Sequence, residues 1–185
     1  EQIAEKSSFI ETSYLLIYGE LPTQKQLEDF NYHIVHHSMV HESIKNFYDG
    51  FPNNPHPMAV CSAVVGSLAT FYQNELSVRD DREIEIAIHR LMAKLPTIAA
   101  YSYKKSIGLP LSYPDNSLGY SENFLKMMFS LPCEEYEPDE DAAKVLDVLL
   151  ILHADHEQNC STSAARIVGS SMCNLFASIS SAIYA

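Results

Sequence analysis

Residues 23–48 decide the fold class, and they read TQKQLEDFNYHIVHHSMVHESIKNFY. Thr23 and Gln26 have the spacing of a capping box, which marks the start of a helix. After this start, apolar and histidine side chains recur every three or four residues along one stripe: Leu27, Phe30, Ile34, His37, His41, Ile44 and Tyr48. The stretch therefore predicts one long helix.

The rest of the chain carries the same kind of signal. Pro57 and Pro96 are suited to the first turn of a helix, and Gly19 and Gly108 are suited to follow a helix end. No segment alternates apolar and polar residues between hairpin turns, and neither Asn-Gly nor Asp-Gly occurs. We therefore expect an all-α protein, with helices near residues 3–18, 23–48, 57–74, 80–94, 96–107, 119–130, 139–157 and 160–185.

The composition is that of a folded domain with an acidic surface. The 185 residues are 46% apolar and 19% charged, and a chain of this length can bury one core. Twelve lysines and arginines against 24 aspartates and glutamates give a net charge of −12, which disfavours nucleic acid and membrane lipid as partners. Four cysteines without close pairs favour free thiols in a reducing intracellular compartment, such as cytoplasm, mitochondrial matrix or peroxisome.

Two stretches, 53–74 and 167–185, contain no charged residue and are each about as long as a membrane span. Both are rich in serine and alanine and poor in leucine, so we expect buried helices instead. One chain of this length is not expected to cover both, which predicts that they lie in the interface of a homodimer. The second stretch reaches Ala185 without a residue that stops a helix, so we expect the natural chain to continue.

Two histidine clusters are candidates for chemistry, and the first is His33, His36, His37 and His41. Because His37 and His41 are four residues apart, they would share one helix face and could share a metal. The glutamate that follows the first histidine of a zinc-protease helix is absent. Packed histidines, an anion subsite and a metal site all remain open for this cluster.

The second cluster is residues 153–161, HADHEQNCS, which follow an apolar run. Asn159 or Ser161 could cap the last helix, whose first N–H groups would favour an anion such as a carboxylate substrate. A helix end satisfied by polar residues, or a metal site of His153, Asp155 and His156, are alternatives. A helical metal-dependent hydrolase is the alternative function, with ligands from both clusters: His37, His41, His153 and His156. No nucleophile elbow, P-loop or dinucleotide glycine motif occurs.

The second cluster also carries a family resemblance. LHADHEQNCSTS (152–163) resembles the oxaloacetate-site segment of citrate synthases, especially of the branch that includes the hexameric enzymes of Gram-negative bacteria. Further segments resemble the family in the same order: YLLIYGELPT (14–23), HPMA (56–59), KLPTIAA (94–100), YKKSIG (103–108), NFLKMMF (123–129) and GSS (169–171). The resemblance covers essentially the whole chain.

The resemblance implies that residues 1–185 are part of a large helical domain, with the small domain and the remaining helices outside this chain. It implies an acyltransferase of the tricarboxylic acid or glyoxylate cycle, which condenses acetyl-CoA with oxaloacetate and water to give citrate and CoA. Neither metal nor cofactor is implied, and the assembly is a homodimer or a higher homo-oligomer. A 2-methylcitrate synthase of the same family and a non-catalytic helical interaction domain are the alternatives.

By its place in the motif, His156 corresponds to the family's first oxaloacetate-binding histidine, and His153, Asn159 and Ser161 support the site. The family's later histidine, its catalytic aspartate and its carboxylate-binding arginines have no counterpart here, so we expect the 185 residues alone to be inactive.

A further implied site is regulatory. In the bacterial branch, an inhibitory NADH site on the large domain uses positions that correspond here to His37, Tyr72, Arg90 and Lys94. A reactive cysteine that lies near this site in that branch corresponds to Cys133. Arginine and lysine can hold phosphate and tyrosine can stack on a base. The chain departs from the branch at His36, where the branch has arginine, and at Ser38, where it has threonine.

Overall fold

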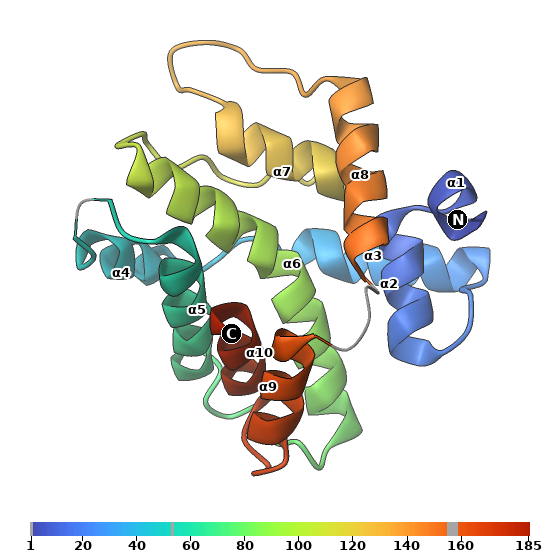
Figure 1. Ribbon diagram of the computed structural model, residues 1–185. Coiled ribbons are helices and arrows are strands. Elements are labelled where there is room, and N and C mark those ends of the chain that lie inside the picture. Colours follow the sequence, from blue (N-terminus) through green and yellow to red (C-terminus); the bar gives the residue numbers. More distant parts are fainter. Residues whose placement is uncertain (1, 53, 155–158) are drawn as a thin grey trace.

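The computed structural model describes residues 2–52, 54–154 and 159–185, and in these ranges the chain forms helices, turns and loops without a strand (Figure 1). The expected all-α class is confirmed. The α-helices are α1 (Gln2–Lys6), α2 (Phe9–Tyr18), α3 (Gln24–His36), α4 (Lys45–Asp49), α5 (Pro57–Ser67), α6 (Asp81–Ser106), α7 (Tyr120–Phe129), α8 (Glu140–Ala154), α9 (Cys160–Gly169) and α10 (Leu175–Tyr184). Short 3₁₀ helices cover Glu42–Ile44 and Leu68–Thr70. None of the helices described has both the length and the hydropathy of a membrane span.

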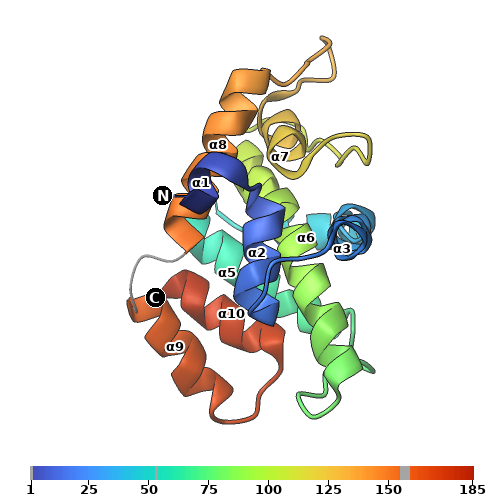
Figure 2. The same ribbon diagram turned by 90° about the vertical axis from the view of Figure 1, so that its right-hand side faces the viewer.

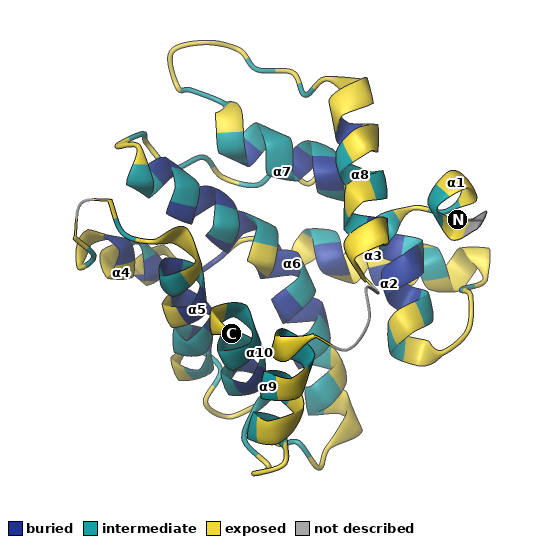
Figure 3. Cartoon of the chain, in the orientation of Figure 1, coloured by how far each residue is buried: buried dark blue, intermediate teal, exposed yellow. Residues whose placement is uncertain are grey.

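The long helix α6 is the centre of the fold, and α3, α5, α7 and α10 pack against it (Figures 1 and 2). Its buried residues run along most of its length (Figure 3). One core cluster joins α6 to α5 and α10 through Val64, Ile98 and Phe176, each 0% exposed. A second joins α6 to α2 and α3 and includes Tyr14 and Phe30.

The helix expected to break at Pro96 is continuous, so the two helices expected at 80–94 and 96–107 are one. Proline removes the N–H that would bond to the carbonyl four residues earlier, which here is the carbonyl of Met92. The Tyr120 hydroxyl of α7 donates to that oxygen at 3.0 Å. A side chain from another helix therefore replaces the missing donor, which is why proline does not end α6.

The helix expected over 23–48 is too long, because α3 ends at His36. The capping box of Thr23 and Gln26 is present as expected. At the other end, the Ser38 hydroxyl donates to the carbonyl of Val35 at 2.7 Å, and Thr97 of α6 donates to the carbonyl of Ser38 at 2.8 Å. Hydrogen bonds from α6 thus replace the next helical turn.

The helix expected over 160–185 is also divided. α9 and α10 are separated by a turn in which Met172 has a φ of +60°, and Asn174 caps α10 by accepting from the amide of Ala177 at 3.0 Å. A residue in the left-handed region cannot continue a right-handed helix. The chain can therefore fold α9 back alongside α10.

The two uncharged helices α5 and α10 pack on each other within one chain (Figures 1 and 2). Ser62 donates to the carbonyl of Ser180, and Ser180 donates to the carbonyl of Ser62, both at 2.8 Å. A Cβ on Gly66 would lie 3.1 Å from the Ser180 hydroxyl, so a larger residue here would have to displace that side chain slightly. Small residues thus let the two backbones approach, although Met58 on α5 and Tyr184 on α10 remain exposed. That these two helices lie in the interface of a homodimer stays a prediction.

Candidate functional site

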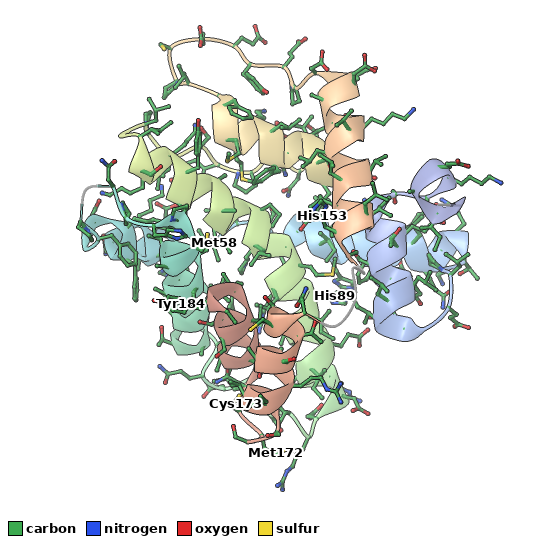
Figure 4. The ribbon with its side chains drawn as sticks, viewed as in Figure 1. Met58, His89, His153, Met172, Cys173 and Tyr184 are labelled. Atoms are coloured by element: carbon green, nitrogen blue, oxygen red, sulfur yellow. The ribbon has the colours of Figure 1, made fainter. Side chains whose placement is uncertain are left out.

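The junction between α8 and α9 carries the second histidine cluster. α8 ends at Ala154, one residue after His153, whose exposed ring is labelled in Figure 4. The His153 Nδ1 lies 2.7 Å from the carbonyl of Leu149. Because a carbonyl only accepts, Nδ1 donates the hydrogen, and a neutral ring then carries its lone pair on Nε2.

Asn159 is the N-cap of α9. Its Oδ1 accepts from the amide of Thr162 at 3.0 Å and lies 3.2 Å from the Thr162 hydroxyl, which also donates to it. Of the two expected caps, the structure thus has Asn159, while the half-buried Ser161 lies in the first turn. The remaining first amides of such a helix have no intrahelical acceptor and favour an anion. The junction can therefore contribute N–H donors to a carboxylate.

His156 and Asp155 lie outside the described residues, so the structure does not position the central histidine of the predicted site. Described residues on both sides of it are positioned, since His153 lies in the last turn of α8 and Asn159 is the N-cap of α9. The role of His156 stays a prediction.

The first histidine cluster does not have the arrangement expected of a metal site. His37 follows the last residue of α3, whereas His41 caps the next 3₁₀ helix by accepting from the amide of Ser43 at 3.1 Å. The two rings therefore do not share one helix face, and this part of the prediction is wrong. In the part of the chain that the structure describes, no three histidine, cysteine, aspartate or glutamate residues are grouped as metal ligands.

The predicted nucleotide site is brought together around α6. The Arg90 guanidinium lies over the Tyr72 ring at 4.0 Å, and its NH1 is 2.5 Å from Glu75 Oε2. One turn further along α6, Lys94 Nζ donates to the carbonyls of His37 at 2.5 Å and Met39 at 2.6 Å. All four predicted positions are thus neighbours, but both cations already have partners that a phosphate would have to displace.

Electrostatics at this site reflect the crowding of cations. Burial and, to a smaller extent, the positive charge of Arg90 together lower the pKa of Lys94 to about 8. Burial also lowers the pKa of His37, followed by the charges of Lys94 and Arg90. The exposed Cys133 lies in the loop between α7 and α8. Figures 1 and 2 show this loop toward the C-terminal end of α6, whereas the turn that precedes Asp81 lies at the N-terminal end of α6.

Two residues at these sites were not predicted. Glu75 forms the ion pair with Arg90, and Asp147 on α8 accepts from the amide of Phe9 at 2.9 Å and the hydroxyl of Ser121 at 3.1 Å. Asp147 thereby attaches α8, and with it the junction, to α2 and α7. Its position as the one carboxylate inside the apolar run 145–152 is the signal that could have identified it.

Comparison with known proteins defines first the class of the fold. The citrate synthase of Pyrobaculum aerophilum superposes with a TM-score of 0.88 at 34% identity, over 100% of this chain and 46% of that one. The citrate synthase of Thermotoga maritima superposes with a TM-score of 0.80 at 31% identity, with the same coverage. The fold is that of a helical region of citrate synthases.

The sequence comparisons are more specific. The family model described as "Citrate synthase, C-terminal domain" matches residues 1–185. Citrate synthase 1 of Mycobacterium tuberculosis is 57% identical over 185 residues, which are 100% of this chain and 43% of that protein. Citrate synthase of Corynebacterium glutamicum is 50% identical over 183 residues, 99% of this chain and 42% of that protein.

The chain belongs to the citrate synthase family, and it spans less than half the length of these relatives. The family resemblance of the sequence is thereby confirmed, and the metal-dependent hydrolase is not supported. The relation to the branch of hexameric Gram-negative enzymes stays a prediction.

Proposed function

We propose that the protein containing this chain is a citrate synthase, which condenses acetyl-CoA with oxaloacetate and water to give citrate and CoA. The observation that carries this proposal is the 57% identity to a citrate synthase along the whole chain. Residues 1–185 would be part of the large helical domain, with the small domain formed by other sequence.

The α8–α9 junction supports binding of oxaloacetate, which carries two carboxylates. His156 would donate a hydrogen bond to the substrate, and the first turn of α9 would add N–H donors and the positive end of its dipole. Asn159 holds that turn in place through its cap. Donors fixed before the reaction stabilise the charge that develops on the ketone oxygen when the enol of acetyl-CoA attacks it.

The test of this assignment is His156→Ala in the whole protein. A hydrogen bond to a charged group contributes about 1.5–3 kcal/mol, so kcat/KM for oxaloacetate should fall at least about tenfold. His36→Ala is the control, because His36 is an exposed histidine at the end of α3, outside the proposed site, and its Nδ1 lies 2.8 Å from the carbonyl of Tyr32. Equal activity of the His156→Ala and unmodified proteins would remove His156 from the site.

A 2-methylcitrate synthase is the alternative within the family. Propionyl-CoA exceeds acetyl-CoA by one methylene, a difference that a pocket discriminates by about 10- to 200-fold. The ratio of kcat/KM for the two thioesters therefore decides between the two activities.

The proposed chemistry needs neither a metal nor a cofactor. Proton transfer and hydrogen-bonded polarisation of the ketone suffice for the condensation. Activity after exhaustive chelation, together with metal analysis of the purified protein, tests this proposal. Stoichiometric zinc whose removal abolishes turnover would overturn it.

We also propose a homodimer or higher homo-oligomer, whose interface includes α8 and α9. Apolar side chains stand exposed on these helices: Val145 at 59%, Leu149 at 46%, Leu152 at 52% and Ile167 at 72%. α9 has no buried residue. Exposed apolar residues in this number are typical of an interaction surface, and Figure 2 shows both helices along one side of the molecule.

The assembly is tested by Leu149→Arg and Ile167→Arg in the whole protein. Either change places a charge in the proposed interface and should shift the oligomer toward monomer in analytical ultracentrifugation. Leu21→Arg is the control, because Leu21 is 57% exposed and lies between α2 and α3. An oligomer that survives both α8–α9 substitutions would place the interface elsewhere.

Inhibition by NADH at His37, Tyr72, Arg90 and Lys94 stays a separate proposal. The stacking partner and the two cations are neighbours, which supports it. Tyr72→Leu should then weaken NADH inhibition while leaving kcat/KM for oxaloacetate unchanged. Absence of inhibition in the unmodified protein would end the proposal.

A further inference from the structure

Three imidazole rings lie next to one another where α3 meets α6. The rings of His33 and His89 are nearly parallel, at 11°, with centroids 5.0 Å apart. The rings of His33 and His37 are also parallel, at 10°, with centroids 6.2 Å apart. Phe30 packs edge-on against His89 at 5.3 Å. One stacked pair of imidazoles, His33 with His89, therefore joins α3 to α6.

His89, labelled in Figure 4, is buried and has an unpartnered nitrogen. The residue is 7% exposed, and among the described residues nothing forms a hydrogen bond with its Nε2. A cavity of about 200 Å³ adjoins the ring and is lined also by Phe30, His33 and Glu85. A neutral imidazole tolerates such a site, whereas a protonated ring would bury a charge and a donor without an acceptor.

The groups that face His89 come from three helices. α6 contributes Glu85, α3 with the residue after it contributes Asp29, His33 and His37, and α2 contributes Tyr14 and Tyr18. The Glu85 carboxylate accepts from the Tyr18 hydroxyl at 3.3 Å. Two further imidazoles thus act on His89, and of the two carboxylates that line the cavity, Glu85 already has a partner.

These surroundings disfavour a proton on His89. Burial lowers its pKa most, and the charge of His33 lowers it next, while Glu85 acts in the opposite direction. Since the ring of His33 is 5.0 Å away, two protonated rings would place like charges in contact.

The same junction holds the segment that follows α3. Lys94 Nζ donates to the carbonyls of His37 and Met39, and the Thr97 hydroxyl donates to the carbonyl of Ser38. Three hydrogen bonds from α6 therefore fasten residues 37–39 directly after the row of rings. A separation of α3 from α6 would strain all three bonds.

We propose that the His33–His89 pair is a proton-sensitive junction, which fastens α3 and residues 37–39 to α6 while both rings are neutral and loosens them when the rings are protonated. An opened state binds protons more readily than the closed state, because His89 then reaches water. The closed state is therefore complete above the ordinary histidine pKa of about 6.5 and is lost as the pH falls below it. This inference is independent of the proposed activity.

Hydrogen exchange of the whole protein at neutral pH and about one pH unit below 6.5 tests the proposal. After correction for the chemical exchange rate, amides of residues 30–41 should exchange at least about threefold faster in acid, because opening becomes more frequent. His89→Phe keeps a ring beside Phe30 but takes no proton. The ratio of its corrected exchange rates in acid and at neutral pH should therefore be close to one. Amides of α10 serve as the internal reference.

His56→Gln is the matched control, because His56 is exposed at the start of α5 and makes no capping bond. It should keep the acid response of the unmodified protein. If His89→Phe does not fold, His33→Gln replaces it, since it removes one of the two charges and should reduce the response. Three results would overturn the proposal. The first is no acid response in the unmodified protein, and the second is an unchanged response in folded His89→Phe or His33→Gln. The third is loss of the response in His56→Gln as well.

Discussion

The pair α5–α10 and the pair α8–α9 both carry apolar side chains, but these side chains have different surroundings. α5 and α10 carry no charge, pack on each other and bury Val64 and Phe176 completely. α8 carries the apolar run 145–152, yet it exposes Leu149, and α9 buries no residue. The difference shows that apolar side chains in a helix do not predict whether the surface that covers them belongs to the same chain.

The largest expected effect is the loss of the central side chain in the covered pair. Phe176→Ala should lower the free energy of unfolding by about 3–5 kcal/mol, because it leaves a cavity between α5, α6 and α10. Ile167→Ala, at a side chain 72% exposed on α9, should change it by about 0.5 kcal/mol or less. Urea unfolding of dilute protein measures both, and similar losses at the two positions would contradict the comparison.

The next effect concerns charge in the covered region. Because the pKa of Lys94 is lowered to about 8, the unfolded chain binds more protons than the folded chain above that pH. Stability should therefore rise by up to about 1.4 kcal/mol per pH unit between about pH 8 and 9.5.

Lys94→Met should flatten this rise, and Lys144→Met, at an exposed residue of α8, should leave it unchanged. Thermal unfolding at several pH values measures the slopes. A rise that persists in Lys94→Met would assign it to other groups.

A smaller effect is expected at the close contact of α5 and α10. Ser62→Ala removes the hydrogen bond to the carbonyl of Ser180 and should cost about 0.5–1.5 kcal/mol. Ser170→Ala removes a hydroxyl that only bonds to a carbonyl of its own helix, that of Ile167, and should cost less than about 0.5 kcal/mol. Equal losses of unfolding free energy in the two proteins would show that the hydrogen bond between α5 and α10 stabilises the fold no more than a bond within one helix.

The smallest effect is expected at the turn that separates α9 from α10. Met172→Gly should raise the free energy of unfolding by about 0.5–1 kcal/mol, because glycine adopts a positive φ without steric cost. Met172→Ala keeps the steric cost and should bring no gain. The unfolding midpoints of the two proteins measure this effect. A gain in stability in Met172→Ala would show that loss of the methionine side chain, not relief of the positive φ, is the cause.

The sequence predicted what depends on neighbours along the chain. The capping box of Thr23 and the cap at Asn159 are both present because the bonding groups lie three residues apart. The all-α class follows from the same periodicity. The end of α3 could not be predicted, because Thr97, almost sixty residues later, supplies the bond that replaces the next turn.

The candidate site shows the same division. The motif 152–163 was sufficient to identify the family, since residue types and order are enough for that. The expected pairing of His37 with His41 failed, because it assumed a helix that tertiary contacts end at His36. Asp147 was missed because its partners Phe9 and Ser121 come from two other helices.

Pro96 has a consequence for how α7 finds its alignment during folding. Along the interior of α6, the carbonyl of Met92 is the one that proline leaves without its helical donor. Tyr120 donates to it only when α7 stands at one axial position, so a slip of one turn removes the hydrogen bond at this half-buried carbonyl and costs about 0.5–1.5 kcal/mol. A proline that weakens α6 thus favours the native axial position of α7 over positions shifted by one turn.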